Sequence, residues 1–313
     1  MKIISGLQEF KLDASSAIAI GKFDGVHIGH RLLLDYILKQ KQNGMQAVVF
    51  TFDKAPGALF AKGDVQYMEI YTLEEKRAMF EALGIDVLIE FPLTMQTAAI
   101  PAEEFVTKIL ITQMQAKYIA AGEDVHFGHK GLGDSSILKR LGKEHGFEVE
   151  IVKKLCVDLS EKEKDVVASS TLVRAMITSG EIEKANKLLA MNFSLHGKVV
   201  AGNQMGSKLL DMPTANVVWP KNKIKPPFGV YFSEVRIRGA SYKGITNVGT
   251  KPTVDSKNIV LAETYIYEFS DDIYGEEIDV ELLYFHRKEM KFDGLEELKR
   301  QMQADMQSGK SFV

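Results

Sequence analysis

The first 190 or so residues alternate short apolar runs with segments in which apolar side chains recur every three or four positions. The apolar runs, which are typical of buried strands, cover residues 17–21, 46–52, 86–91, 117–122 and 147–152. The helical periodicity covers residues 30–42, 73–84, 102–114 and 135–146. This alternation predicts a parallel sheet of five strands with helices on its faces.

The pattern changes in the second half of the chain. Residues 169–193 have helical character, with Gly180 interrupting two short amphipathic segments, and we expect these helices to close the first domain. From about Phe193 onward, short β-rich runs separated by Gly and Pro predict a small antiparallel β-barrel with a closing helix over 293–307. The expected domains are therefore residues 1–187 and 188–313.

Composition narrows the class of protein. A length of 313 residues favours two domains, and 45% hydrophobic with 26% charged residues is typical of a folded globular chain. The net charge of -3 supplies no overall positive potential that would attract a nucleic acid. The single cysteine excludes an intramolecular disulfide and a multi-thiolate metal cluster. Without a signal-peptide core or a spanning apolar run, we expect a soluble, unprocessed cytoplasmic protein with no nucleic-acid or membrane partner, as a monomer or weak homo-oligomer.

The run GKFDGVHIGH (21–30) follows the first predicted strand and leads into the first predicted helix. An open α/β sheet binds its ligand at this kind of position. Gly21, Gly25 and Gly29 permit tight turns, and the helix start offers unpaired N–H groups to an anion. His27 and His30 could stabilise charge on a phosphate by hydrogen bonds and, when protonated, by a positive charge.

The spacing within this run argues against two better-known kinds of site. Glycines four residues apart match neither the dinucleotide pattern G-x-G-x-x-G nor the P-loop G-x-x-x-x-G-K-[ST], and no nearby His or Cys completes a zinc site with the two histidines. A purely structural Gly-His turn stays open as an alternative when this motif is taken alone.

The run also resembles the H-x-G-H signature of nucleotidyltransferases, in the form seen in prokaryotic bifunctional riboflavin kinase/FAD synthetases. Three later stretches resemble further motifs of that family in the expected order: TFDKAP (51–56), AGEDVHFGHKGLGD (121–134) and SSTLVR (169–174). The four motifs together cover most of the first domain. The resemblance implies a Rossmann-like nucleotidyltransferase domain that acts as an FMN adenylyltransferase.

The family pattern implies roles for particular residues of this domain. It assigns ATP binding to Gly21, Phe23, Asp24, Gly25, His27, Gly29, His30, Ser170, Thr171 and Arg174, and flavin binding to Asp53, Asp124 and Phe127. His27, His30 and Asp124 are the implied catalytic residues. Taken alone, SSTLVR is equally well explained as a capped helix start. The family's usual His-Pro pair after Asp53 is replaced here, and we assign no metal to the pair His126 and His129.

The second half carries GNQMGSKLLDMPTANVVWP (202–220), in which Thr214 and Asn216 offer hard oxygen atoms suited to magnesium. PTAN alone could equally be a turn. Followed by GVY (229–231), NVGTKPT (247–253), AET and HRKEMKF, it resembles the riboflavin kinase domain of the same enzymes. The resemblance implies that the ATP-binding residues are Gly202, Gly206 and Pro213, the Mg2+ ligands Thr214 and Asn216, the general base Glu263, and a flavin contact Arg287.

Simpler structural roles are also open to these residues. Glu263 could be the outward residue of an alternating strand, and Arg287 a solvated charge. The family's Gly-Arg-x-x-Gly-Phe run is replaced by SKLLDM, Tyr265 stands where His is frequent, and Lys251 where Arg is common. The sequence GKS at 309–311 imitates the end of a P-loop, but no helix can start there, and we dismiss it.

The resemblance as a whole implies an enzyme that converts riboflavin and ATP to FMN, and FMN and ATP to FAD and pyrophosphate, with Mg2+. One alternative is a monofunctional FAD synthetase whose kinase half has decayed, which the departures around SKLLDM and Tyr265 suggest. A second alternative is a flavin sensor that binds its ligand without turnover.

Overall fold

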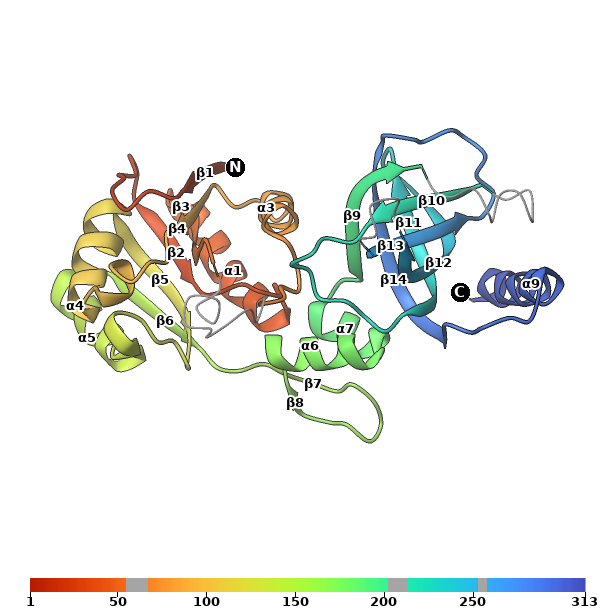
Figure 1. The fold of residues 1–313 in the computed structure, drawn as a ribbon. Coiled ribbons are helices and arrows are strands. Elements are labelled where there is room, and N and C mark those ends of the chain that lie inside the picture. The colour runs from red at the N-terminus through yellow and green to blue at the C-terminus, as the bar shows by residue number, and fades with distance from the viewer. Residues whose placement is uncertain (55–66, 202–212, 253–257, 313) are drawn as a thin grey trace. The chain divides into compact units, whose positions relative to one another are not determined.

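The computed structural model describes residues 1–54, 67–201, 213–252 and 258–312. The chain divides into two compact units, Met1–Ser170 and Thr171–Val313 (Figure 1). The first unit is an α/β domain and the second contains a closed β-barrel. The predicted fold class, a parallel-sheet domain followed by a small antiparallel barrel, is confirmed.

A sheet of six parallel strands forms the centre of the first unit. The strands are β1 (Lys2–Ser5), β2 (Ser16–Ile20), β3 (Gln46–Phe52), β4 (Val87–Phe91), β5 (Ala116–Gly122) and β6 (Glu148–Val152), in the order β1-β4-β3-β2-β5-β6. Five of them coincide with the predicted runs. The prediction missed β1, because this four-residue edge strand is exposed at three positions and shows no buried run.

Helices cover both faces of this sheet. They are α1 (Ile28–Lys39), α3 (Leu73–Ala82), α4 (Ala102–Glu104), the π-helix η3 (Phe105–Gln113) and α5 (Ser135–His145), with short 3-10 turns at η1 (Gln40–Asn43), η2 (Thr97–Ala99) and η4 (His129–Gly131). Successive residues of β2 face opposite sides: Ala17 and Ala19 contact the core beneath α1 and α3, whereas Ile18 and Ile20 contact the core beneath η3 and α5.

The predicted helix at 102–114 is wound more loosely than expected. Met114 N–H donates to the Ile109 carbonyl at 3.0 Å, and the Thr107 carbonyl accepts from the Thr112 hydroxyl at 2.8 Å, both across five residues. The segment VTKILIT is rich in β-branched residues, which crowd a regular α-helical turn and lower its propensity.

Strand order fixes where a ligand can bind in this unit. The chain runs from β2 outward to β3 and β4, then returns to the other side of β2 with β5 and β6. The carboxyl ends of β2 and β5 therefore flank the point where the strand order reverses, which is where open α/β sheets form a crevice. The 21–30 run follows β2, and the 121–134 motif begins in the last residues of β5 and continues beyond it.

The second unit consists of two short helices, the barrel and a C-terminal helix. These are α6 (Ser170–Ser179), α7 (Ile182–Leu189), β9 (Phe193–Val200), β10 (Thr214–Val218), β11 (Gly229–Ile237), β12 (Ala240–Pro252), β13 (Asn258–Ile266), β14 (Glu277–Lys288) and α9 (Leu295–Ser311). The barrel closes in the order β10-β13-β12-β11-β14-β9 (Figure 1). A two-stranded hairpin, β7 (Cys156–Val157) and β8 (Val166–Val167), belongs to the first unit.

The two helices at 170–189 group with the barrel. The Asn186 side chain donates to the Leu282 carbonyl of β14 at 2.9 Å and accepts from Phe193 N–H of β9 at 2.8 Å. Gly180 separates α6 from α7 with a φ of +86°, as its interrupting position in the sequence indicates. The compact units thus divide after residue 170, earlier than the expected boundary after residue 187.

Helix α9 covers an outer face of the barrel. Met306 and Phe312 pack on Val230, Phe232 and Ile245, and the Tyr267 hydroxyl donates to the Met306 carbonyl at 2.7 Å. The GKS sequence at 309–311 forms the last turn of this helix and cannot begin one.

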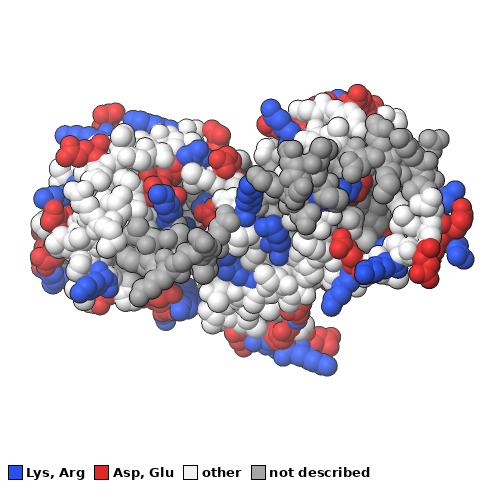
Figure 2. Space-filling model, viewed as in Figure 1, with Lys and Arg blue, Asp and Glu red and all other residues white. Residues whose placement is uncertain are grey.

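No helix within the described ranges is long and apolar enough to cross a membrane. On the face shown in Figure 2, acidic and basic side chains are interspersed over both units, as a net charge of -3 with similar numbers of each sign leads one to expect.

Candidate active sites

The turn after β2 is held in a strained conformation. Phe23 and Val26 have φ values of +46° and +43°, and both side chains are completely buried. Such left-handed conformations cost non-glycine residues about 1–3 kcal/mol each and persist only where the surrounding structure enforces them. The Lys22 carbonyl accepts a bond from the Thr51 hydroxyl at 3.2 Å, which ties the turn to β3. The strain marks this turn as the first candidate site.

His27 and His30 lie together at the start of α1. His27 is the N-cap residue of the helix, and the two imidazole rings stack with their centroids 3.9 Å apart. In the described part of the chain, Nδ1 of each ring is buried without a hydrogen-bond partner. Gly29 permits this packing, because a Cβ there would stand 3.2 Å from His27 Cε1. Two unsatisfied ring nitrogens at a helix N-terminus are well placed to meet an anionic ligand.

Burial keeps these imidazoles neutral at pH 7. It lowers the pKa of His27 to about 4, although Asp24 and Asp124 favour the protonated ring. Burial, and secondarily the neighbouring His27, lowers the pKa of His30 well below its usual range. The sequence left open whether the pair acts by hydrogen bonds or by charge, and the structure favours neutral hydrogen-bonding rings until an anion arrives.

These pKa shifts predict an acid-sensitive α/β unit. The unfolded chain takes up a proton at His27 near pH 6.5 and the folded chain only near pH 4, so the stabilisation is present above 6.5 and lost as the pH falls through this window. The loss from His27 is of order 3 kcal/mol. His27→Phe, which cannot titrate, should flatten the decline of the urea midpoint followed by circular dichroism between pH 6.5 and 4.

The only tryptophan provides a control for this measurement. Trp219 is buried in the barrel unit, so its fluorescence reports that unit's unfolding. Its transition should respond to pH equally in His27→Phe and in the parent chain. An unaltered pH dependence of the circular dichroism transition in the variant would contradict the assignment.

Phe23 and Asp24 hold the turn from inside. The Phe23 ring centroid lies 5.0 Å from that of His30 and 5.6 Å from that of Phe80 in α3. Because the ring is buried in this way, the expected contact of Phe23 with ATP would involve its main-chain atoms. The Asp24 carboxylate accepts from Ile70 N–H at 3.2 Å and from the Tyr67 hydroxyl at 3.4 Å. Asp24 therefore ties the segment before α3 to the strained turn after β2.

The two implied flavin-side acids follow β3 and β5. Asp53 accepts from Leu93 N–H at 2.8 Å, and Asp124 forms an exposed ion pair with Lys154 at 3.2 Å. Gly122 leaves room for Asp124, because a Cβ there would stand 3.0 Å from its Oδ1. The electrostatic effect of Asp124 on His27 indicates that these two groups lie near each other.

The HFGH loop is built around Phe127. This buried residue pairs with Gly133 through two backbone hydrogen bonds, and its ring lies 5.6 Å from the Phe105 ring. His126 Nδ1 lies 3.1 Å from the Gly131 carbonyl. The described residues contain no group of three or more His, Cys, Asp or Glu that could hold a metal. Phe127 thus stabilises the loop mainly by packing its ring into the hydrophobic core.

The SSTLVR motif begins α6. Ser170 and Thr171 are the first residues of that helix, and Arg174 follows one turn later, with Val173 buried beside it. The division between the compact units falls between Ser170 and Thr171. The expected contacts of Ser170, Thr171 and Arg174 with a triphosphate stay predictions.

The barrel carries the second candidate site, centred on Glu263 of β13. Register pairs Glu263 with Asn216 on β10 and with Asn247 on β12. One Glu263 oxygen accepts from the Thr214 hydroxyl at 3.0 Å, and the other pairs with Lys251 Nζ at 2.6 Å. Asn216 is 1% exposed, and its Oδ1 has no hydrogen-bond partner among the described residues. Glu263 is therefore part of a polar cluster, not a free outward side chain.

A cavity of about 650 Å³ adjoins this cluster. Its lining includes Thr214, Lys251, Glu263 and Tyr265, with an apolar wall from β11, β12 and α9. Arg287 also lines it, held by hydrogen bonds of 2.5–3.1 Å to Asp305, which is 3% exposed. Arg287 is thus a fixed wall residue rather than a solvated charge. The volume suits a cofactor-sized ligand.

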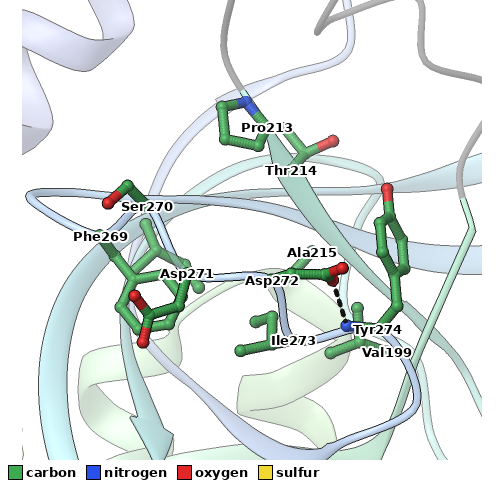
Figure 3. A pocket seen from close by; sticks show the side chains of 11 residues that line it. Val199, Pro213, Thr214, Ala215, Phe269, Ser270, Asp271, Asp272, Ile273 and Tyr274 are labelled. Atoms are coloured by element: carbon green, nitrogen blue, oxygen red, sulfur yellow. Dashed lines mark hydrogen bonds between the residues drawn. The ribbon is translucent and has the colours of Figure 1, made fainter.

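Thr214 also lines a smaller cavity of about 220 Å³ (Figure 3). Pro213 lines it, together with Phe269 and the loop from Ser270 to Tyr274. Asp272 shapes that loop by accepting from Tyr274 N–H at 3.0 Å. Gly202, Gly206 and the SKLLDM segment fall outside the described residues, so their expected role in ATP binding stays a prediction.

Sequence reasoning did not identify several residues of these sites. Asp305 was unmarked because a lone acid in an amphipathic helix resembles any solvated charge, and only the fold brings it to Arg287. Lys154, which pairs with Asp124, lies outside all of the sequence motifs. The loop after β13 has an Asp-Asp-x-Tyr-Gly composition that is typical of a turn, and nothing in this composition indicates a ligand-binding site.

Each of the two units matches a known protein family. The FAD synthetase family matches residues 9–170, and the riboflavin kinase family matches residues 189–313. A bifunctional riboflavin kinase/FMN adenylyltransferase of Listeria monocytogenes is 32% identical, covering 96% of this chain and 93% of its own. Another from Buchnera aphidicola (subspecies Schizaphis graminum) is 33% identical, covering 100% and 99%.

A solved structure agrees with the fold over the whole chain. The crystal structure of a protein named macrolide-efflux protein, from Streptococcus pneumoniae, is 30% identical with a TM-score of 0.86, and the alignment covers 99% of both chains. The α/β site and the barrel site follow one another along the chain in the same order as the two family matches. The relatives match this order over nearly their full length. This chain belongs to the family of bifunctional riboflavin kinase/FMN adenylyltransferases.

Proposed function

We propose that this chain phosphorylates riboflavin to FMN at the barrel site and transfers AMP from ATP to FMN at the α/β site, giving FAD and pyrophosphate. The observation that carries the proposal is the cluster of Glu263, Thr214 and Asn216 beside a cavity of about 650 Å³, in a chain that also presents the His27/His30 pair. A decayed kinase half would not be expected to retain this cluster.

In the kinase reaction, Glu263 acts as general base. The ribityl 5′-hydroxyl gives its proton to Glu263 as its oxygen bonds to the γ-phosphorus, and the bond from that phosphorus to the bridging oxygen breaks to release ADP. The larger cavity takes the flavin, with Arg287 on its wall, and the smaller cavity beside Pro213 takes the nucleoside end of ATP. Thr214 lines both cavities, so the transferred phosphate belongs beside it.

The residues at the barrel site fit a magnesium ion. Asn216 Oδ1 is a buried hard oxygen with no hydrogen-bond partner in the described chain, and the Thr214 hydroxyl lies on the same strand two residues away. These two side chains would hold Mg2+ with the ATP phosphates. When bound, the ion supplies charge neutralisation on the phosphate oxygens.

In the adenylyl transfer, the protein positions two anions and stabilises the leaving group. An FMN phosphate oxygen bonds to the α-phosphorus of ATP, the bond from that phosphorus to the bridging oxygen breaks, and pyrophosphate leaves. No covalent intermediate with the protein is needed. His27 and His30 donate hydrogen bonds to the phosphates, and Asp53 and Asp124 bind on the flavin side.

A time course tests the proposal directly. The purified chain incubated with riboflavin, ATP and Mg2+ should produce FMN first and FAD later, separated by chromatography. Flavin binding without any ATP-dependent product would support the sensor alternative. FAD formation from supplied FMN with no FMN formation from riboflavin would support the monofunctional synthetase.

We also propose a cytoplasmic location. A single cysteine suits a reducing compartment, and both of the proposed reactions consume ATP.

A further inference from the structure

An ion pair between β14 and α9 fixes one wall of the larger cavity. Arg287 Nε donates to the two carboxylate oxygens of Asp305 at 2.9 and 3.1 Å, and Nη2 donates to Oδ2 at 2.5 Å. The Arg287 and Asp305 side chains are only 19% and 4% exposed. Asp305 Oδ1 also accepts from Gln301 at 2.8 Å and lies 3.4 Å from His286 Nε2. The carboxylate is therefore held from several sides.

The Arg287 guanidinium keeps donors that are not used by this ion pair. A guanidinium group carries five N–H groups in a rigid plane. Nε and Nη2 each use one of them on Asp305, and Nη1 donates one to the Lys288 carbonyl at 3.0 Å. Among the contacts of the described residues, one N–H on each terminal nitrogen is left over. Since Arg287 lines the cavity, these two N–H groups form a fork that suits an oxygen acceptor of a ligand.

A single row of paired residues runs across the barrel from Arg287 to Glu263. Register pairs Arg287 with Val230, Val230 with Asn247, and Asn247 with Glu263. All four residues line the cavity. Three strand spacings of about 4.8 Å separate the two ends of the row, which is about 14 Å along the sheet. An extended riboflavin molecule is of comparable length, so a flavin whose 5′-hydroxyl lies at Glu263 brings its ring system toward Arg287.

We propose that Asp305 is a positioning residue for flavin recognition: it orients the Arg287 guanidinium so that its two remaining N–H groups bind the carbonyl oxygens of the pyrimidinedione ring. This inference rests on the proposed phosphorylation of riboflavin at the barrel site. Asp305 acts through Arg287 and does not itself bind the flavin ring. Because its carboxylate balances the charge of Arg287, the fork suits a neutral carbonyl better than a phosphate.

The test uses the full chain with Asp305→Asn, which replaces one acceptor oxygen by an NH2 donor that faces the guanidinium. We expect the KM for riboflavin in FMN formation to rise about tenfold, the loss of one charge-assisted hydrogen bond. The KM for ATP and kcat should stay within about twofold. Asp305→Glu keeps the carboxylate and should restore most of the riboflavin affinity. The matched control is Glu296→Gln, at an exposed position of the same helix, and it should change none of these constants.

A ring-modified probe separates positioning from general support of the helix. Sulfur accepts hydrogen bonds more weakly than oxygen, so the parent chain should bind 2-thioriboflavin or 4-thioriboflavin about tenfold more weakly than riboflavin in equilibrium dialysis. Asp305→Asn should bind riboflavin and the thio analogues nearly alike. In an Arg287→Met background, Asp305→Asn should cause no further loss of riboflavin affinity, because the two residues act as one unit.

Several outcomes would overturn the role of Asp305. They are an unchanged KM for riboflavin in Asp305→Asn, undiminished discrimination against the thio analogues in that variant, and a further loss of affinity in the Arg287→Met background. The last result would mean that Asp305 only supports α9. Failure of the proposed function looks different: the parent chain would form no FMN from riboflavin and ATP, while the dialysis measurements, which need no turnover, would still show the ring preference and its dependence on Asp305.

Discussion

Replacing His27 and His30 together by alanine should lower the rate of FAD formation from FMN and ATP at least about 10³-fold, since single preorganised donors to a developing negative charge contribute 10²–10³-fold. FMN formation from riboflavin should stay within about twofold, because the barrel site is built from other residues in another unit. The rings carry the polar atoms of both side chains, and alanine leaves none of them to face the phosphates. Separate chromatographic assays of the two reactions measure the effect.

His145→Ala is the matched control for the histidine variant. His145 is an exposed residue in the last turn of α5, away from the strained turn, and its loss should change neither rate. Circular dichroism of the double variant should show the parental helix content. FAD formation at the parental rate in a folded His27→Ala/His30→Ala protein would refute the assignment of the α/β site.

Glu263→Gln should show the reverse selectivity. The amide keeps the size of the side chain but cannot accept the ribityl proton, so FMN formation should fall about 10²–10⁴-fold, the usual contribution of a general base. FAD formation from supplied FMN should be retained. When riboflavin is the only flavin supplied, FAD should also disappear, because its precursor is not made.

Glu268→Gln is the comparison for the base variant. It makes the same change five residues further along, at an exposed position beyond the end of β13. It should leave both rates at the parental level. Equal losses in the two glutamine variants would mean that any amide in this region disturbs the barrel, and the effect could no longer be attributed to Glu263.

Most of the fold could be predicted from apolar periodicity, and the exceptions have physical causes. β10 was hidden because PTAN has the composition of a turn, yet Thr214–Val218 is paired on both sides, to β9 and β13. The helices at 170–189 were expected to close the first domain, but their buried faces, including Leu188 and Leu189, group with the barrel. Periodicity indicates that a helix has a buried face and does not indicate which core receives it.

The sites could be located from motifs, whereas their chemistry needed the fold. The sequence places His27 and His30 three residues apart, but the stacked rings and their lowered pKa values follow from burial beneath a turn that no spacing rule describes. Likewise, alternation along β13 suggested an outward Glu263, and only the pairing of β10, β12 and β13 brings Thr214 and Lys251 to it. Contacts between residues far apart in sequence are set by register.

The neutral imidazoles at the start of α1 have a consequence for how nucleotide affinity responds to acidity. A triphosphate favours charged rings, whereas burial in the turn favours uncharged ones. Nucleotide capture at this turn is then accompanied by uptake of hydrogen ions from the buffer. Mild acidification therefore raises the affinity of the α/β unit for ATP while it lowers the free energy of unfolding of the same unit.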